Sequence, residues 1–138
     1  MSAERAAGGC LCGAVRYAVD GPLRPVIACH CGQCRRWSGH LVAATAAPRS
    51  ALTVDGNEAL AWYESSPGIR RGFCRTCGSS LFWGDEAAPT ISIMAGTLDA
   101  PSGLTTERHI FAADKGDYYD IADSLPRQDG DRERGGDR

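Results

Sequence analysis

Apolar and polar side chains alternate along short stretches of this chain, which is the pattern of half-buried β-strands. Between Cys10 and Val19, the apolar residues Val15, Tyr17 and Val19 alternate with smaller or charged residues. Similar alternation, together with short apolar runs bounded by glycine and proline turns, predicts further strands within residues 23–31, 40–46, 52–54, 60–63, 69–73, 81–83, 90–95 and 107–112.

Helix is expected to be a minor component. No stretch of ten or more residues is amphipathic at the helical period; residues 33–37 suit a short helical turn, and residues 48–52 suit a turn or a single helical turn. Many short strands separated by turns therefore predict a mostly β domain of short antiparallel strands.

The length and composition suit one compact domain, since the chain has 138 residues and 43% hydrophobic content. The composition changes after Pro126, because residues 127–138 contain four arginines, four acidic residues, three glycines, one glutamine and no apolar side chain. We therefore expect a single domain over residues 1–126 and a disordered, charged tail over residues 127–138.

The charge pattern excludes some partners. The formal net charge is −2 and the arginines form no basic block, so we expect no nucleic-acid partner. Residues 1–9 lack the apolar region of a signal peptide, and no later stretch approaches the length of a membrane span. The sequence therefore predicts a soluble, cytoplasmic protein with no membrane partner.

Seven cysteines are the main chemical feature of the sequence. An odd number without a secretion signal argues against a disulfide framework and favours metal ligation. Two Cys-x-Cys-Gly motifs occur at residues 10–13 and 29–32, the second followed by Cys34, and one Cys-x-x-Cys-Gly motif occurs at residues 74–78. Residues i and i+2 of a strand share a face, so small rotamer changes bring both sulfurs to about 2.3 Å from one zinc ion. The glycine after each pair can adopt a positive φ and fold the backbone around the metal.

Seven thiolates divide naturally into a closed four-ligand zinc site and a three-ligand site with one open position. Spacing alone allows two partitions. In one, the first and last motifs share a zinc ion and the central motif binds a second: Cys10, Cys12, Cys74 and Cys77, then Cys29, Cys31 and Cys34. In the other, Cys31 and Cys34 join the last motif. We prefer the first partition because it keeps three near neighbours on one local element.

Three segments resemble the glutathione-dependent formaldehyde-activating enzyme family, which also includes centromere protein V: residues 8–17, 29–39 and 71–83. The similarity continues through residues 96–99, 109–111 and 123–126. It implies a β-tent fold organised around zinc knuckles and two zinc ions. It also implies that Cys10, Cys12, Cys74 and Cys77 are structural zinc ligands, and that Cys29, Cys31 and Cys34 are catalytic zinc ligands.

A zinc ion with three thiolates is electron-rich and a weaker Lewis acid than a three-histidine zinc. It is better suited to hold a fourth thiolate than to make hydroxide. With the resemblance, this predicts a carbon–sulfur lyase similar to S-(hydroxymethyl)glutathione synthase, whose partners are an aldehyde such as formaldehyde and a small thiol such as glutathione. The alternatives are a non-catalytic, zinc-stabilised binding module with the same fold, and a redox enzyme with metal-free thiols.

Other candidate residues have weaker signals. On a strand, His30 would point away from Cys29 and Cys31, so we expect a packed or surface histidine rather than a ligand. His40 and His109 are candidates for proton transfer. Further residues have both a possible pocket role and an ordinary packing or turn role: Trp37, Phe73, Trp83, Arg70 and Arg71.

Overall fold

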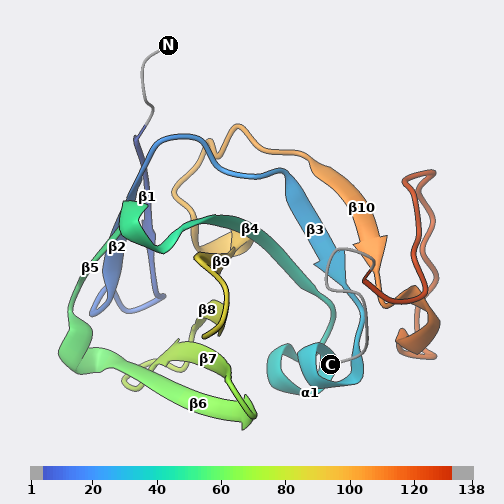
Figure 1. Cartoon of the computed structure of the whole chain (residues 1–138), viewed down its shortest axis with the longest axis horizontal. Coiled ribbons are helices and arrows are strands. Elements are labelled where there is room, and N and C mark those ends of the chain that lie inside the picture. The colour runs from blue at the N-terminus through green and yellow to red at the C-terminus, as the bar shows by residue number, and fades with distance from the viewer. Residues whose placement is uncertain (1–4, 132–138) are drawn as a thin grey trace.

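The computed structural model describes residues 5–131, which form two β-sheets and one short α-helix. Figure 1 shows the smaller sheet on one side of the molecule and β3 with β10 on the other. The result confirms the predicted fold class, because the chain is mostly β and its strands are short.

The smaller sheet has the order β1-β2-β5 and is antiparallel throughout. Its strands are β1 (Arg5–Gly9), β2 (Arg16–Asp20) and β5 (Leu52–Asp55). Strand β1 has no alternating pattern and was therefore not predicted. The strand is held by its pairing with β2, where Gly8 lies opposite Tyr17. A Cβ atom on Gly8 would collide with the Tyr17 ring and the Thr97 carbonyl oxygen, so this close approach requires glycine.

The larger sheet has seven strands in the order β10-β3-β4-β9-β8-β7-β6. Their bounds are β3 (Val26–Cys29), β4 (Val42–Pro48), β6 (Leu60–Ser66), β7 (Ile69–Cys74), β8 (Ser80–Asp85), β9 (Thr90–Met94) and β10 (Thr106–Ile110). Neighbouring strands are antiparallel except β10 and β3, which are parallel. This parallel pair departs from the purely antiparallel expectation.

Helix α1 (Gly32–Ser38) follows β3 directly and lies where the predicted helical turn was expected. Cys31 caps its first turn, because the Cys31 sulfur accepts a hydrogen bond from the backbone N–H of Cys34 at 3.3 Å. Gly39 ends the helix in a left-handed conformation with φ 86°. Short 3₁₀ helices connect other strands: η1 (Arg49–Ala51), η2 (Asn57–Ala59), η3 (Ala95–Thr97) and η4 (Ala112–Asp114).

Two groups of buried side chains form the core. The first lies between the sheets, where Tyr17 packs edge-on against Phe82 with ring centroids 5.4 Å apart. The second surrounds the end of β3 and includes Ile27, Met94 and Phe111. Each group contains buried cysteines: Cys10 and Cys74 lie in the first, and Cys29, Cys31 and Cys34 lie in the second.

The C-terminal segment differs from the expected disordered tail. Residues 126–130 run beside β10, where the backbone N–H of Gln128 donates to the His109 carbonyl at 2.9 Å. The Phe111 N–H donates to the Gly130 carbonyl at 3.1 Å, and Asp131 is buried. The free edge of β10 supplies backbone partners that composition does not reveal. The rest of the expected tail, residues 132–138, lies outside the described residues, as do residues 1–4. Within residues 5–131, no helix is long and apolar enough to cross a membrane.

Candidate metal centres

The structure gathers the first and last cysteine motifs at one place. We call Cys10, Cys12, Cys74 and Cys77 the four-cysteine cluster; its sulfurs all lie within 4.8 Å of one another. The Cys10–Cys12 and Cys12–Cys74 sulfur pairs are 3.7 and 3.8 Å apart. Sulfurs placed tetrahedrally at the Zn–S distance of about 2.3 Å are separated by about 3.8 Å. The cluster therefore has the size of a four-thiolate zinc site.

Backbone turns around the four-cysteine cluster direct N–H groups at sulfur. The Cys10 sulfur accepts from Val15 at 3.3 Å, and the Cys74 sulfur accepts from Thr76 and Cys77 at 3.4 Å. Such bonds favour the thiolate form that a metal requires. A hydrogen bond with the Ser79 hydroxyl, 3.2 Å from the Cys77 sulfur, is the main cause that lowers the pKa of Cys77 to about 5.

The glycine prediction is correct at two of the three motifs. Gly13 and Gly78 have φ of 85° and 83° and turn the chain after their cysteines. Gly32 is not one of the described glycines with a positive φ. It begins α1 instead of a knuckle turn. The central motif therefore builds its cluster with a strand and a helix.

Cys29, Cys31 and Cys34 form the three-cysteine cluster, in which all three side chains are buried. Cys29 ends β3, Cys31 caps α1 and Cys34 lies in the first turn of α1. The three sulfurs lie within 4.8 Å of one another, with Cys34 and Cys29 3.4 Å apart. This donor set fits a zinc ion with three protein thiolates and one further position.

A cavity of about 280 Å³ adjoins the three-cysteine cluster. Cys29 and Cys34 form part of its wall. Other lining residues are apolar or aromatic: Ile27, Val42, Ala44, Ala46, Trp83, Ala88, Met94 and Ile110. Polar residues line the rest: Arg24, Asp85, Thr90, Ser92 and Asp131. Apolar walls and several polar groups thus meet beside two candidate metal ligands, an arrangement that can hold a small molecule with both apolar and polar parts.

Arg71 of β7 also lies beside the three-cysteine cluster. Its side chain is buried, and one guanidinium nitrogen lies 3.9 Å from the Cys34 sulfur. The guanidinium also stacks on Trp37 of α1, 5.1 Å from the ring centroid. Trp37 and Trp83 pack against the core around this cluster, so both have the packing role that the sequence predicted, and Trp83 also lines the cavity.

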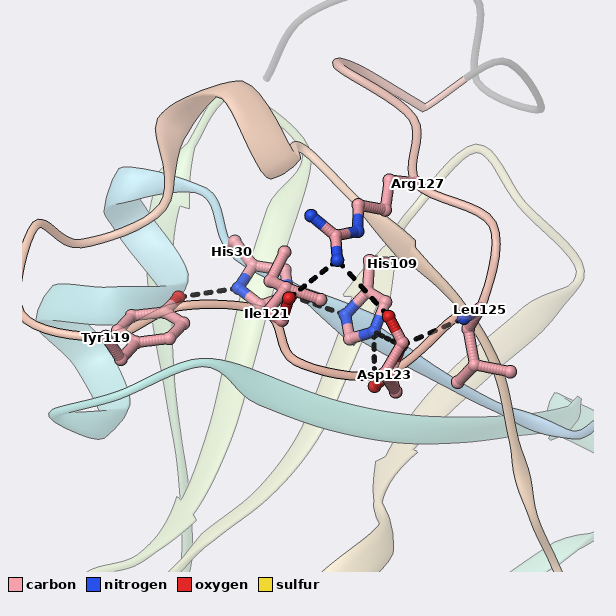
Figure 2. Close-up of polar contacts among 7 residues, drawn as sticks. All are labelled: His30, His109, Tyr119, Ile121, Asp123, Leu125 and Arg127. Atoms are coloured by element: carbon pink, nitrogen blue, oxygen red, sulfur yellow. Dashed lines mark hydrogen bonds and ion pairs between the residues drawn. The ribbon is translucent and has the colours of Figure 1, made fainter.

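His30 points away from the neighbouring sulfurs, as predicted, into a chain of polar contacts that includes two buried histidines, the half-buried Tyr119 and the exposed Asp123 (Figure 2). Its Nδ1 lies 2.5 Å from the Tyr119 hydroxyl, and its Nε2 lies 2.8 Å from Nδ1 of His109. His109 Nε2 in turn lies 3.0 Å from the carboxylate of Asp123. We call these four residues the histidine network. It joins the residue after β3 to β10 and to residues 119–123.

Two residues of the histidine network, His30 and Asp123, have lowered pKa values for different reasons. Burial, and then the nearby His109, lower the pKa of His30 to about 4, so its imidazole is neutral at neutral pH. The Leu125 backbone N–H and then the His109 side chain lower the pKa of Asp123. His40, the other candidate for proton transfer, is exposed and lies 2.7 Å from the Tyr118 hydroxyl.

Sequence reasoning missed several of these neighbours. Tyr119 and the cavity-lining Arg24 and Asp85 were not singled out, because their distance along the chain from the cysteines gives no signal. Asp123 did have a signal in the sequence, because it is the first residue of the last segment that resembles the family, residues 123–126. Arg71 was predicted to have either a pocket role or an ordinary turn role, and only the fold brings it to Cys34.

Comparison with known proteins places these features in context. The family model described as glutathione-dependent formaldehyde-activating enzyme matches residues 5–114. An uncharacterized lyase of Schizosaccharomyces pombe is 28% identical over 116 residues, which are 83% of this chain and 84% of that protein. A Halomonas elongata protein, provisionally named a glutathione-dependent formaldehyde-activating enzyme, is 31% identical over 125 residues, covering 83% of this chain and 79% of that protein.

A solved structure supports the same relationship. The crystal structure of a Rhodobacter sphaeroides protein superposes with a TM-score of 0.60 at 28% identity, covering 72% of this chain and 97% of that chain. The agreement extends the sequence similarity to the arrangement of strands.

Proposed function

Since the chain belongs to the glutathione-dependent formaldehyde-activating enzyme family, we propose that it is a zinc-dependent carbon–sulfur lyase acting on the adduct of an aldehyde with a small thiol. Glutathione and formaldehyde are the reactants that the family description suggests. The names of the relatives support a lyase-like activity of this kind.

The observation that supports this proposal most strongly is the position of the three-cysteine cluster. Its sulfurs offer one ligand fewer than a closed site needs, and two of its cysteines face the cavity. A small molecule in the cavity would therefore reach the remaining coordination position. The four-cysteine cluster offers a complete set of ligands and is proposed to be structural.

In the proposed reaction, the thiol sulfur adds to the aldehyde carbon, a carbon–sulfur bond forms, and the proton lost from sulfur ends on the former carbonyl oxygen. The reverse direction breaks the same bond. A zinc ion bound by Cys29, Cys31 and Cys34 would lower the pKa of the thiol and hold its sulfur.

The residues of the chain would position the reactants. Apolar walls from Ile27, Trp83 and Met94 would exclude water from the reacting atoms, which strengthens electrostatic interactions there. Thr90 and Ser92 offer hydroxyl groups for the polar parts of the thiol compound. Holding both reactants side by side in one cavity would make a bimolecular reaction effectively unimolecular.

The test compares zinc-loaded wild type with Cys31→Ser and, as a matched control, Cys12→Ser. We expect two zinc ions per wild-type chain, and one in Cys31→Ser with the fold retained. Glutathione–formaldehyde exchange, followed by NMR, should accelerate with wild type and lose this acceleration in Cys31→Ser. A zinc-loaded wild type that neither binds nor turns over small thiols would overturn the proposal and favour a non-catalytic binding module.

A further inference from the structure

We propose that Arg71 is the counter-cation of the three-cysteine cluster and makes it prefer an anionic ligand at the open position. This inference rests on the proposed function, because it explains why a thiolate rather than a neutral molecule would complete the site. Arg71 would act on the ligand through charge, without being a metal ligand itself.

The first argument is burial. Only 1% of Arg71 is exposed, although an arginine is almost never fully buried without a partner for its charge. Within residues 5–131, no carboxylate forms an ion pair with Arg71. The neighbouring Arg70 is exposed and has an acidic partner, Glu86, at 3.6 Å. The buried charge of Arg71 therefore needs compensation of another kind.

The second argument is how the guanidinium is held. Its Nε donates to the Ser65 hydroxyl at 3.0 Å, and one terminal nitrogen donates to the Gln33 side-chain oxygen at 3.0 Å. The Trp37 ring covers one face. These partners are all neutral, so they orient the guanidinium without cancelling its charge.

The third argument is the direction of the remaining nitrogen, which lies 3.9 Å from the Cys34 sulfur. Three thiolates and one zinc ion have a net charge of −1, and a thiolate as fourth ligand makes it −2. A fixed positive charge beside Cys34 stabilises both states of the cluster, and stabilises the more negative one more. A neutral fourth ligand adds no charge and gains little from Arg71.

The experiment uses the full chain with metal in both clusters, and the variants Arg71→Gln, Arg71→Lys and Arg70→Gln. Competition with a chromophoric chelator measures the zinc affinity of the second site. Cobalt in place of zinc gives a visible spectrum for titration with glutathione and with imidazole, an anionic and a neutral fourth ligand. Arg71→Gln should weaken zinc binding at this site, and glutathione binding by about tenfold or more, with less than about twofold change for imidazole.

The controls separate charge from packing. Arg71→Lys keeps the charge and should recover part of the glutathione affinity, whereas the exposed Arg70→Gln should change neither titration. Equal losses for glutathione and imidazole, or unchanged zinc and glutathione affinities in Arg71→Gln, would overturn the inference. If wild type binds the metal but no thiol, the proposed function fails, and the zinc competition still decides the role of Arg71.

A second variant covers the case in which Arg71→Gln does not fold. Gln33→Glu keeps the side-chain shape and gives Arg71 a competing carboxylate where the amide oxygen now lies. We expect the same selective loss of zinc and glutathione affinity. An unchanged ratio of glutathione to imidazole affinity in folded Gln33→Glu would contradict the proposed role of Arg71.

Discussion

The two cysteine clusters use the same ligand atom but are assembled differently. The four-cysteine cluster takes two sulfurs from the turn after β1, one from the last residue of β7 and one from the turn between β7 and β8. It therefore joins the smaller sheet to the larger one. The three-cysteine cluster takes its sulfurs from residues 29–34, where a strand continues directly into a helix.

Their surroundings differ as much as their assembly. Cys12 of the four-cysteine cluster is exposed, whereas the three-cysteine cluster is buried beside a cavity, a buried arginine and the histidine network. Two sites with identical donor atoms can thus have different uses, because the number of sulfurs and the adjoining space decide what else can bind.

The largest expected effect comes from Cys74→Ser, which removes a ligand that joins the two sheets. We expect the free energy of unfolding to fall by more than about 4 kcal/mol, because metal binding at such sites contributes directly to folding. Cys34→Ser should cost about 1–3 kcal/mol, since the local strand and helix keep their other contacts. Urea denaturation with metal analysis measures both, and equal losses would contradict the distinction between the clusters.

The next effect concerns the cavity that adjoins the three-cysteine cluster. Ala46→Leu should fill part of this space and weaken glutathione binding by about tenfold while both metals are retained. Ala43→Leu, on the same strand but outside the cavity lining, is the matched control. Calorimetric titration measures the affinities, and an equal loss in both variants would argue against binding in the cavity.

The histidine network should contribute less. His109→Phe keeps an aromatic ring but leaves the Nε2 atom of buried His30 without its partner, at a cost of about 1–3 kcal/mol in the free energy of unfolding. Urea denaturation measures this cost. We expect the metal content of both clusters to remain. Loss of metal from the three-cysteine cluster alone would show that the network holds that cluster together.

The smallest effect is a pH dependence near the three-cysteine cluster. The pKa of His30 falls from its ordinary 6.5 to about 4 in the folded chain, so the unfolded chain binds more protons between these values. Stability is therefore greatest above pH 6.5 and decreases as the pH falls toward 4, by on the order of 1 kcal/mol at pH 5.5. His30→Gln should reduce this slope, and His40→Gln should not. Urea denaturation midpoints, determined over this pH range at constant zinc content, measure the slope.

Local sequence patterns were sufficient for most strands and for α1. Alternation and turn residues act over a few neighbours, so they predict where an extended segment begins and ends. They failed for β1, whose residues Arg5–Gly9 show no alternation and become a strand only through pairing with β2. They also failed for residues 127–131, which are polar but find backbone partners along β10.

The sequence by itself determined the donor atoms that residues 10–12, 29–34 and 74–77 offer, because cysteine type and close spacing are read directly from it. It also determined the three-cysteine cluster, whose members are neighbours along one strand and helix. Only the tertiary structure decided that the first and last motifs meet, that Arg71 reaches Cys34, and that a cavity lies beside the cluster. These contacts depend on strand order and register, which no local pattern records.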